Sequence, residues 1–192
     1  MKVYDISQEV FSCKVYPGDP KPERIVLKSI AGGDGYNLTA FSMCAHNGTH
    51  VDAPAHFLAD SPTIEQIPLE KFVGECLLVH HEGDVTEEDA NAMVEKLGNI
   101  SRLLISGKAT VTRAAAHVFA DAKLFLVGNE SQSVGPEDAP AAVHKILLGN
   151  GVVLLEGIVL TNIPEGKYLL CAAPLNLAGA DGAPCRAVLI EP

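Results

Sequence analysis

The sequence predicts one α/β domain over residues 1–192, with a mixed sheet and flanking helices. Short apolar runs of the kind found in buried strands alternate with amphipathic helical segments through the middle of the chain. The chain of 192 residues is 47% hydrophobic and 20% charged, which is ordinary for a globular domain with a substantial core. We therefore expect helices on the faces of the sheet and a polar site at the strand ends.

Strands and stiff loops dominate the first third of the chain. Lys2 to Ser7 predicts a first strand, and prolines prevent regular structure in the following loop at residues 17–22. Arg24 to Ile30 and Asn37 to Ala45 predict two neighbouring strands joined by the glycine-rich turn at residues 32–35. The second of these strands leads directly into a segment rich in histidine.

A strand and a capped helix follow. Glu75 to His80 predicts a strand, and the sequence Thr86-Glu87-Glu88-Asp89 resembles a capping box at the start of a helix. Apolar residues then recur at helical spacing, at Ala90, Met93, Val94 and Leu97. We expect this helix to end near Gly98.

Two more helices alternate with strands in the second half. A helix at Thr112 to Ala120 lies between short apolar strands at Arg102 to Ser106 and Leu124 to Val127. A third helix runs from about Ala139 to Leu148, with an apolar stripe that leaves His144 off it. The stripe consists of Ala142, Val143, Ile146 and Leu147, and the remaining strands are Val152 to Leu155, Lys167 to Ala173 and Arg186 to Glu191.

Charge and composition exclude several classes of function. The net charge of −10 and the pI near 5.1 argue against a nucleic-acid partner. The start at Met1 to Asp5 lacks an apolar signal region, and no apolar run approaches the ~20 residues that span a bilayer. Five cysteines without C-x-x-C spacing do not form a disulfide framework. We expect a cytoplasmic protein with neither a membrane nor a nucleic-acid partner.

Three histidines and an aspartate stand within eleven residues, at His46, His50, Asp52 and His56. All four positions are even, so an extended backbone would turn the side chains to one face. A straight strand would nevertheless separate His46 from His50 by roughly 13 Å. The chain must therefore bend at Gly48 and curl back after Pro54 to bring the four groups together. We interpret the segment as a metal site with two to three ligands, in which His56 is a ligand or a catalytic base.

Glu156 is a second polar anomaly, because it ends the buried run Val152 to Leu155. An ionised side chain at the edge of a buried strand requires a partner such as Arg, backbone donors or a cation. His144 is by itself a helix residue of the kind that is usually solvated.

The segment His46-x-Gly-Thr-His50-x-Asp52-x-Pro-x-His56 resembles the signature of the metal-dependent cyclase family, which includes bacterial kynurenine formamidase and isatin hydrolase. The resemblance extends to residues 16–20, to Pro174-Leu175 and to residues 182–187, and so covers almost the whole chain. It implies a swivelling β/β/α architecture and a homodimer or higher homo-oligomer.

The resemblance also implies a ligand set and an activity. His144 and Glu156 would join His46, His50 and Asp52 as ligands of Zn²⁺ or Mn²⁺. The site would hold either one metal ion or two. His56 would take the proton of the metal-bound water and then protonate the leaving amine. The implied reaction is arylformamidase-type hydrolysis of a small amide, converting N-formylkynurenine to kynurenine and formate in tryptophan catabolism.

Some features leave the substrate open. Relatives have an Asp where this chain has Glu130, which we expect near the metal ligands. The chain lacks Trp, so an aromatic pocket depends on residues such as Tyr16, Tyr36 or Phe57, and Tyr16 is the candidate for substrate binding. Alternatives are isatin-like hydrolysis of a cyclic amide, a metal-dependent lyase or isomerase, and a non-catalytic metal-binding protein. The remaining histidines, His80, His81 and His117, are expected to lie away from the metal.

Overall fold

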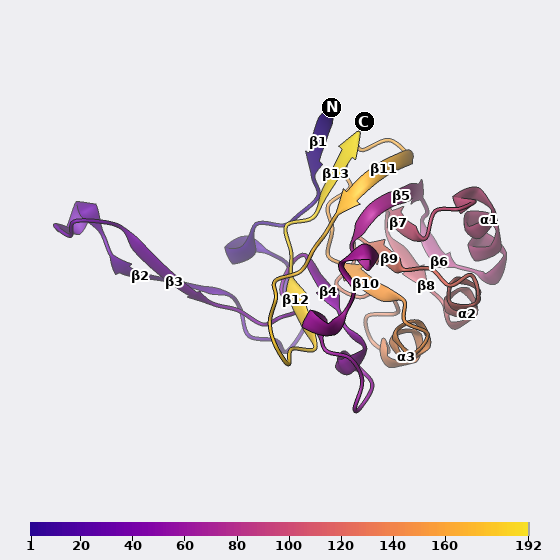
Figure 1. Ribbon diagram of the computed structural model, residues 1–192, viewed down its shortest axis with the longest axis horizontal. Coiled ribbons are helices and arrows are strands. Elements are labelled where there is room, and N and C mark those ends of the chain that lie inside the picture. The colour runs from indigo at the N-terminus through magenta and orange to yellow at the C-terminus, as the bar shows by residue number, and fades with distance from the viewer. Residues whose placement is uncertain (192) are drawn as a thin grey trace.

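The computed structural model describes residues 1–191, whose centre is a nine-stranded mixed sheet (Figure 1). Its strand order is β1-β13-β11-β5-β7-β9-β10-β4-β12. The strands are β1 (Lys2–Asp5), β4 (His50–Asp52), β5 (Val73–His80), β7 (Arg102–Ser106), β9 (Leu126–Asn129), β10 (Val153–Glu156), β11 (Gly166–Cys171), β12 (Gly182–Pro184) and β13 (Val188–Glu191).

Four parallel strands, β5, β7, β9 and β10, form the middle of this sheet. Antiparallel strands extend it on both sides, with β11, β13 and β1 beyond β5 and with β4 and β12 beyond β10. The mixed sheet that the sequence predicts is therefore confirmed. The histidine-rich segment contributes β4, directly beside the last parallel strand.

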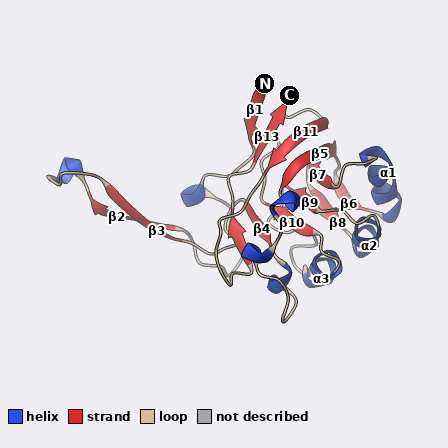
Figure 2. Cartoon of the chain, in the orientation of Figure 1, coloured by secondary structure: helices blue, strands red, loops and turns tan. Residues whose placement is uncertain are grey.

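The flanking helices all lie on one face of the sheet, as Figure 2 shows. They are α1 (Glu87–Leu97), α2 (Arg113–Asp121) and α3 (Ala141–Gly149). Side chains alternate along β5, so Leu77 and Val79 pack in the core under the helices while Leu78 packs in a second core on the opposite face. Loops and short turns cover that second core, for instance through Phe72.

The helix boundaries agree with the sequence pattern, but the buried stripe of α3 does not. The predicted capping box is present, since the Thr86 side chain and the Asp89 side chain each accept from the other's backbone N–H. In α3 the buried residues are Val143, His144, Leu147 and Leu148. The predicted stripe was thus rotated by about one position, and the expectation that His144 faces solvent is wrong.

The sequence pattern does not predict three short strands, β6 (Gly83–Val85), β8 (Ala109–Val111) and β12. Each has three residues, too few for a period of two to be recognised. β6 and β8 pair in parallel outside the large sheet, whereas β12 closes its edge beside β4. The edge that carries the site could therefore not be predicted completely.

A long hairpin projects from the body of the molecule (Figure 1). It consists of β2 (Glu23–Lys28) and β3 (Leu38–Ser42), which pair antiparallel and are joined through a 3-10 turn at Ile30–Gly32. We call this hairpin the arm. All six residues of β2 are exposed, including three consecutive large apolar side chains, Ile25, Val26 and Leu27. No helix within residues 1–191 is long and apolar enough to cross a membrane.

Candidate metal centre and active site

Two neighbouring strands and one helix bring the candidate ligands together. In the pairing of β10 with β4, Glu156 lies opposite His50 and Leu154 lies opposite Asp52. Leu154 packs under the helices, so Glu156, two residues further on, faces the same side. His50 and Asp52 share that face, while Val51 between them packs in the opposite core. His144 reaches the same point from α3.

Four donor groups, His50, Asp52, His144 and Glu156, form a buried cluster that we call the four-donor cluster. His50 Nε2 lies 3.4 Å from Asp52 Oδ1 and 3.5 Å from Glu156 Oε2. His144 Nε2 lies 3.4 Å from Asp52 Oδ2 and 3.2 Å from Glu156 Oε1. Ligands that surround Zn²⁺ tetrahedrally at about 2.1 Å are separated by roughly 3.4 Å. Donor atoms of His50, Asp52 and Glu156 lie within 4.8 Å of one another, as the ligands of one divalent ion do, and His144 contacts the other oxygen of each carboxylate.

Backbone carbonyls fix both imidazoles of this cluster. His50 Nδ1 lies 3.0 Å from the Gly48 carbonyl oxygen, and His144 Nδ1 lies 2.9 Å from that of Pro140. A carbonyl oxygen only accepts, so each Nδ1 donates to it and each ring turns Nε2 to the cluster, where Nε2 would bind a metal in place of its proton. Metal-binding histidines are commonly oriented in this way.

The electrostatics describe four groups that stabilise one another's charge. Burial lowers the pKa of His50 and of His144, but hydrogen bonds to Asp52 and Glu156 outweigh it and raise each pKa to about 10. Burial raises the pKa of Asp52, yet the surrounding histidines, His144 first, hold it well below its usual range. The pKa of Glu156 is lowered in the same way, against burial and the charge of Asp52. Two imidazolium protons thus balance two carboxylates, as one divalent cation would.

One atom of the cluster fits a metal in particular. Asp52 Oδ2 is fully buried, and its contact with His144 Nε2 at 3.4 Å is too long and poorly directed to satisfy it as a hydrogen bond. By contrast, Glu156 Oε1 accepts from the Val134 backbone N–H at 2.7 Å. An unpartnered buried carboxylate oxygen costs free energy unless a cation accompanies it. Imidazole and carboxylate donors are those preferred by zinc, manganese and ferrous iron. The residues present therefore fit a divalent metal.

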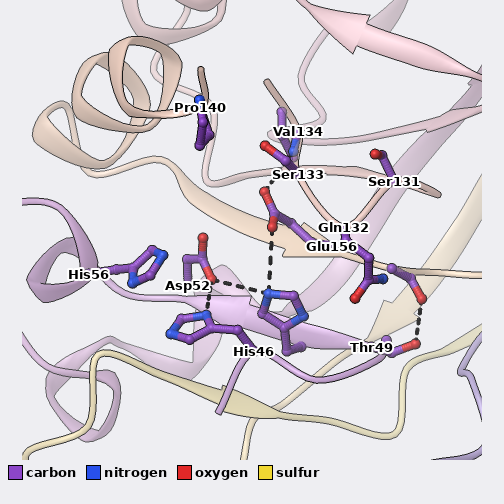
Figure 3. A network of polar contacts seen from close by, with 12 residues as sticks. His46, Thr49, Asp52, His56, Ser131, Gln132, Ser133, Val134, Pro140 and Glu156 are labelled. Atoms are coloured by element: carbon purple, nitrogen blue, oxygen red, sulfur yellow. Dashed lines mark hydrogen bonds and ion pairs between the residues drawn. The ribbon is translucent and has the colours of Figure 1, made fainter. Parts of the chain in front are cut away.

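His46 and His56 lie on the other side of Asp52 (Figure 3). His46 Nδ1 is 2.9 Å from Asp52 Oδ1, and the rings of His46 and His56 stack with centroids 4.0 Å apart. The predicted bend at Gly48 is present, with φ of 63°, and a 3-10 turn at Pro54–His56 curls His56 back towards the site. Donor atoms of His46, Asp52 and His56 lie within 4.8 Å of one another. Asp52 thus belongs to both groups of potential ligands.

A cavity of about 390 Å³ opens beside these groups. Tyr16 and Phe57 line it, as the sequence analysis expects, whereas Tyr36 is exposed and is not among the residues that line it. The Tyr16 hydroxyl donates to the Glu137 carbonyl, which ties the N-terminal loop to the segment before α3. Other residues that line the cavity are Asp19, Cys44, Gln132, Ser133, Pro140 and Asp181.

Glu130 accepts hydrogen bonds from two backbone N–H groups. Its Oε2 accepts from the Gly107 N–H at 2.7 Å and its Oε1 from the Leu160 N–H at 2.8 Å. Within residues 1–191, none of its hydrogen bonds goes to a candidate ligand. The longer side chain joins two loops, and a role of Glu130 behind the metal ligands stays a prediction.

The other histidines lie outside both ligand groups. His80 Nδ1 contacts the Ser106 hydroxyl, His81 Nε2 contacts the Asp84 carbonyl, and His117 is exposed on α2. Sequence reasoning instead missed Asp181, which contacts His46 and His56. Its only sequence signal is that it directly precedes the stretch 182–187 that carries part of the family resemblance.

The sequence matches a known protein family. A family model for Cyclase matches residues 4–136. The chain belongs to the Cyclase family. The histidine-rich segment lies inside the matched range, and α3 and β10, which supply the other two groups of the four-donor cluster, follow it.

Relatives of this cyclase-family chain match it along nearly its whole length. The kynurenine formamidase of Salinibacter ruber is 34% identical over 98% of this chain and 97% of its own. The solved structure of a "predicted metal-dependent hydrolase" from Bacillus stearothermophilus is 31% identical, with a TM-score of 0.81, over 98% of this chain and 97% of that one. Isatin hydrolase A from Labrenzia aggregata has a TM-score of 0.83 at 20% identity, over 100% and 94%, and shows the shared fold.

Proposed function

We propose that this protein is a metal-dependent hydrolase of small amides, with an N-formyl aryl amine such as N-formylkynurenine as substrate. The observation that carries the proposal is the buried four-donor cluster beside a cavity of about 390 Å³, with His56 at its wall. The kynurenine formamidase relative at 34% identity supports the choice of substrate. Cavities of this size are usual for small-molecule ligands.

His50, Asp52, His144 and Glu156 would hold one divalent ion, for which we propose Zn²⁺ or Mn²⁺. Where a second ion is held, His46 would be a ligand of it, with Asp52 shared between the two ions. When bound, the metal supplies Lewis-acid polarisation of the substrate carbonyl and lowers the pKa of a coordinated water. Shared carboxylates of this kind are usual ligands where two ions lie close together.

His56 is positioned to move the proton in this reaction. Its Nδ1 lies 3.0 Å from Asp181 Oδ2, which leaves Nε2 for the reacting groups. As water attacks the formyl carbon, Nε2 takes the proton that the water loses. As the C–N bond breaks, the same proton passes to the amine nitrogen, so that formate and a free amine leave. His56 contacts His46, and a role as a ligand of the second ion is the alternative that metal analysis distinguishes.

The cavity offers groups for both ends of an aryl formamide. Gln132 Oε1 and Ser133 Oγ are buried, line the cavity, and have no hydrogen-bond partner within the described residues. Such atoms require a partner, which the amide or carbonyl groups of a substrate would supply. Phe57 and Tyr16 provide apolar surface for a ring. Ser133→Ala should therefore raise KM more than it lowers kcat.

The substrate assay tests the proposal directly. Purified protein is supplied with Zn²⁺ or Mn²⁺ and offered N-formylkynurenine, isatin and an aliphatic formamide. We expect the aryl formamide to give the highest kcat/KM. If isatin is hydrolysed with the highest kcat/KM, the protein is a cyclic-amide hydrolase and not a formamidase. Metal retention without turnover of any amide or lactam would contradict the hydrolase and leave a lyase, an isomerase or a non-catalytic protein.

We also propose that the protein is a cytoplasmic homodimer in which the arm docks on a second copy. The arm exposes Ile25, Val26, Leu27 and Phe41, an apolar surface that monomeric proteins rarely display on a projecting hairpin. At its base lies a groove of about 540 Å³ lined in part by Phe11, Phe41, Met43 and Leu175. The five cysteines, all free in the structure, are compatible with a reducing compartment.

A further inference from the structure

One carboxylate oxygen contacts two imidazoles of the site. Asp181 Oδ2 lies 2.9 Å from His46 Nε2 and 3.0 Å from His56 Nδ1. We propose that Asp181 is a shared positioning residue, which sets the tautomer and orientation of the ligand His46 and of the base His56 together. The inference rests on the proposed function for the role of His56, whereas its consequence for metal binding through His46 is independent of any substrate.

The donor and acceptor roles at this oxygen follow from its chemistry. A carboxylate only accepts hydrogen bonds, so both imidazole nitrogens that face Asp181 carry protons. His46 Nδ1 faces Asp52 Oδ1 at 2.9 Å and donates to it in this structure, so Nδ1 is the nitrogen that would bind a metal in place of this proton. His56 presents the lone pair of Nε2, where a base is needed. A single group thus selects opposite ring nitrogens on two neighbouring histidines.

The backbone holds Asp181 against the segment that it serves. The Asp181 carbonyl accepts from the Ala53 N–H at 2.9 Å. The next residue, Gly182, pairs with Asp52 across β12 and β4. Both contacts place the carboxylate at a fixed distance from the residues that flank Asp52. The loop before β12 is therefore registered with the ligand strand, although about 130 residues separate them in the sequence.

Gly182 contributes by leaving space. A Cβ at this position would lie 2.7 Å from His46 Cε1 and 2.8 Å from the Val51 carbonyl oxygen. Neither distance is tolerated, and the carbonyl is backbone that cannot move aside. The His46 ring thus occupies the space over Gly182, between Asp181 and Asp52, while His56 stacks on its face at an angle of 28°. The dipeptide Asp181-Gly182 forms a seat for His46.

The first test measures metal affinity and needs no substrate. The dissociation constant for Zn²⁺ is determined by chelator competition for the native protein, Asp181→Ala and His46→Ala. We expect Asp181→Ala to weaken binding roughly 10–100-fold, as loss of such an outer hydrogen bond does. In the His46→Ala background, Asp181→Ala should have no further effect. An unchanged affinity, or a full second loss in that background, would show that Asp181 does not act through His46.

The second test separates positioning from a general structural role. At saturating metal, Asp181→Ala should lower kcat roughly 10–100-fold with KM within about threefold, because removal of one orienting partner misplaces the base. The double variant Asp181→Ala/His56→Ala should have the same kcat as the single variant His56→Ala. Additive losses would overturn the coupling. Asp121→Asn, which alters an exposed carboxylate at the end of α2, serves as the control and should change neither quantity.

The two tests also distinguish this inference from the proposed function. If no amide is hydrolysed but Asp181→Ala still weakens zinc binding through His46, the hydrolase proposal fails. The proposal that Asp181 positions His46 is then still supported. If amides are hydrolysed and Asp181→Ala alters neither affinity nor kcat, the inference fails alone. Asp181→Asn should lie between the native protein and Asp181→Ala, since a neutral amide oxygen in the place of Oδ2 accepts from the two rings more weakly than a carboxylate oxygen.

Discussion

The strand β4 and the arm both depart from the usual distribution of side chains. The strand buries ionisable residues, whereas the arm exposes apolar ones. In β4 all three residues are buried, although two of them, His50 and Asp52, are ionisable. In the arm every residue of β2 is exposed, although Ile25, Val26 and Leu27 are apolar. Buried charges and exposed apolar surface both cost free energy when nothing accompanies them.

Each of the two regions lacks a different kind of partner. The buried strand gathers unlike charges at the spacing of metal ligands, so the missing partner has to be a small cation. The arm has length and apolar area but few groups that could hold an ion, which is why we propose another protein surface as its partner.

The largest effect is expected from Asp52→Ala. This carboxylate contacts His46, His50 and His144, so its removal leaves three histidines without their shared partner. We expect metal content by elemental analysis to fall to background, with hydrolysis lost as well, while light scattering reports an unchanged oligomer. His80→Ala is the matched control, because that histidine lies outside both ligand groups. Retention of stoichiometric metal by Asp52→Ala would remove the basis for the metal centre.

His56→Ala should separate chemistry from metal binding. We expect kcat to fall roughly 10²–10⁴-fold, as loss of a general base does, with metal content unchanged. The reason is that His56 lies outside the four-donor cluster and that its hydrogen bond goes to Asp181. Metal content and kcat are measured on the same preparation. A preparation of His56→Ala without metal would make His56 a ligand and refute this division of roles.

Removal of the metal should destabilise the body of the protein. A ligand present at about 100 times its dissociation constant stabilises the native state by ≈ 2.7 kcal/mol. For a chain of this size that corresponds to a fall in Tm of roughly 5–11 °C when a chelator removes the ion. Differential scanning calorimetry with and without chelator measures the change. An equal shift in Asp52→Ala would show that the chelator acts elsewhere than at this centre.

The sequence could predict most of this body and half of the site. The capping box at Thr86 and the apolar period of α1 are local patterns, and the structure confirms them. The bend at Gly48 followed from ligand reach alone, and the structure has it. The helical pattern alone left His144 off the buried stripe, because burial of a helix face depends on what lies opposite, here Asp52 and Glu156, whereas the family resemblance placed it among the ligands. Asp181 and β12 could not be found, because their place depends on pairing with a strand about 130 residues earlier.

Phe41→Glu should affect the arm and spare the metal centre. Phe41 is exposed on β3 and lines the groove at the base of the arm, so a charge there disfavours docking of a second copy. We expect a dissociation constant of the dimer at least tenfold weaker by light scattering over a concentration series, since burying an unpaired charge at an interface is costly. Lys145→Glu on α3 introduces a similar charge as the control. A native protein that is already monomeric would refute the proposed dimer.

The smallest effect on the site is expected from Glu130→Gln. The carboxylate accepts from two backbone N–H groups, at Gly107 and Leu160, and a glutamine has only one oxygen to offer them. Leaving one donor unpaired costs about 1–3 kcal/mol, so Tm should fall by several degrees. Metal content, kcat and the oligomer should stay as in the native protein, because none of the hydrogen bonds of Glu130 reaches a ligand or the arm within residues 1–191. A loss of metal without a change in Tm would instead place Glu130 beside the ligands, where the family resemblance first suggested it.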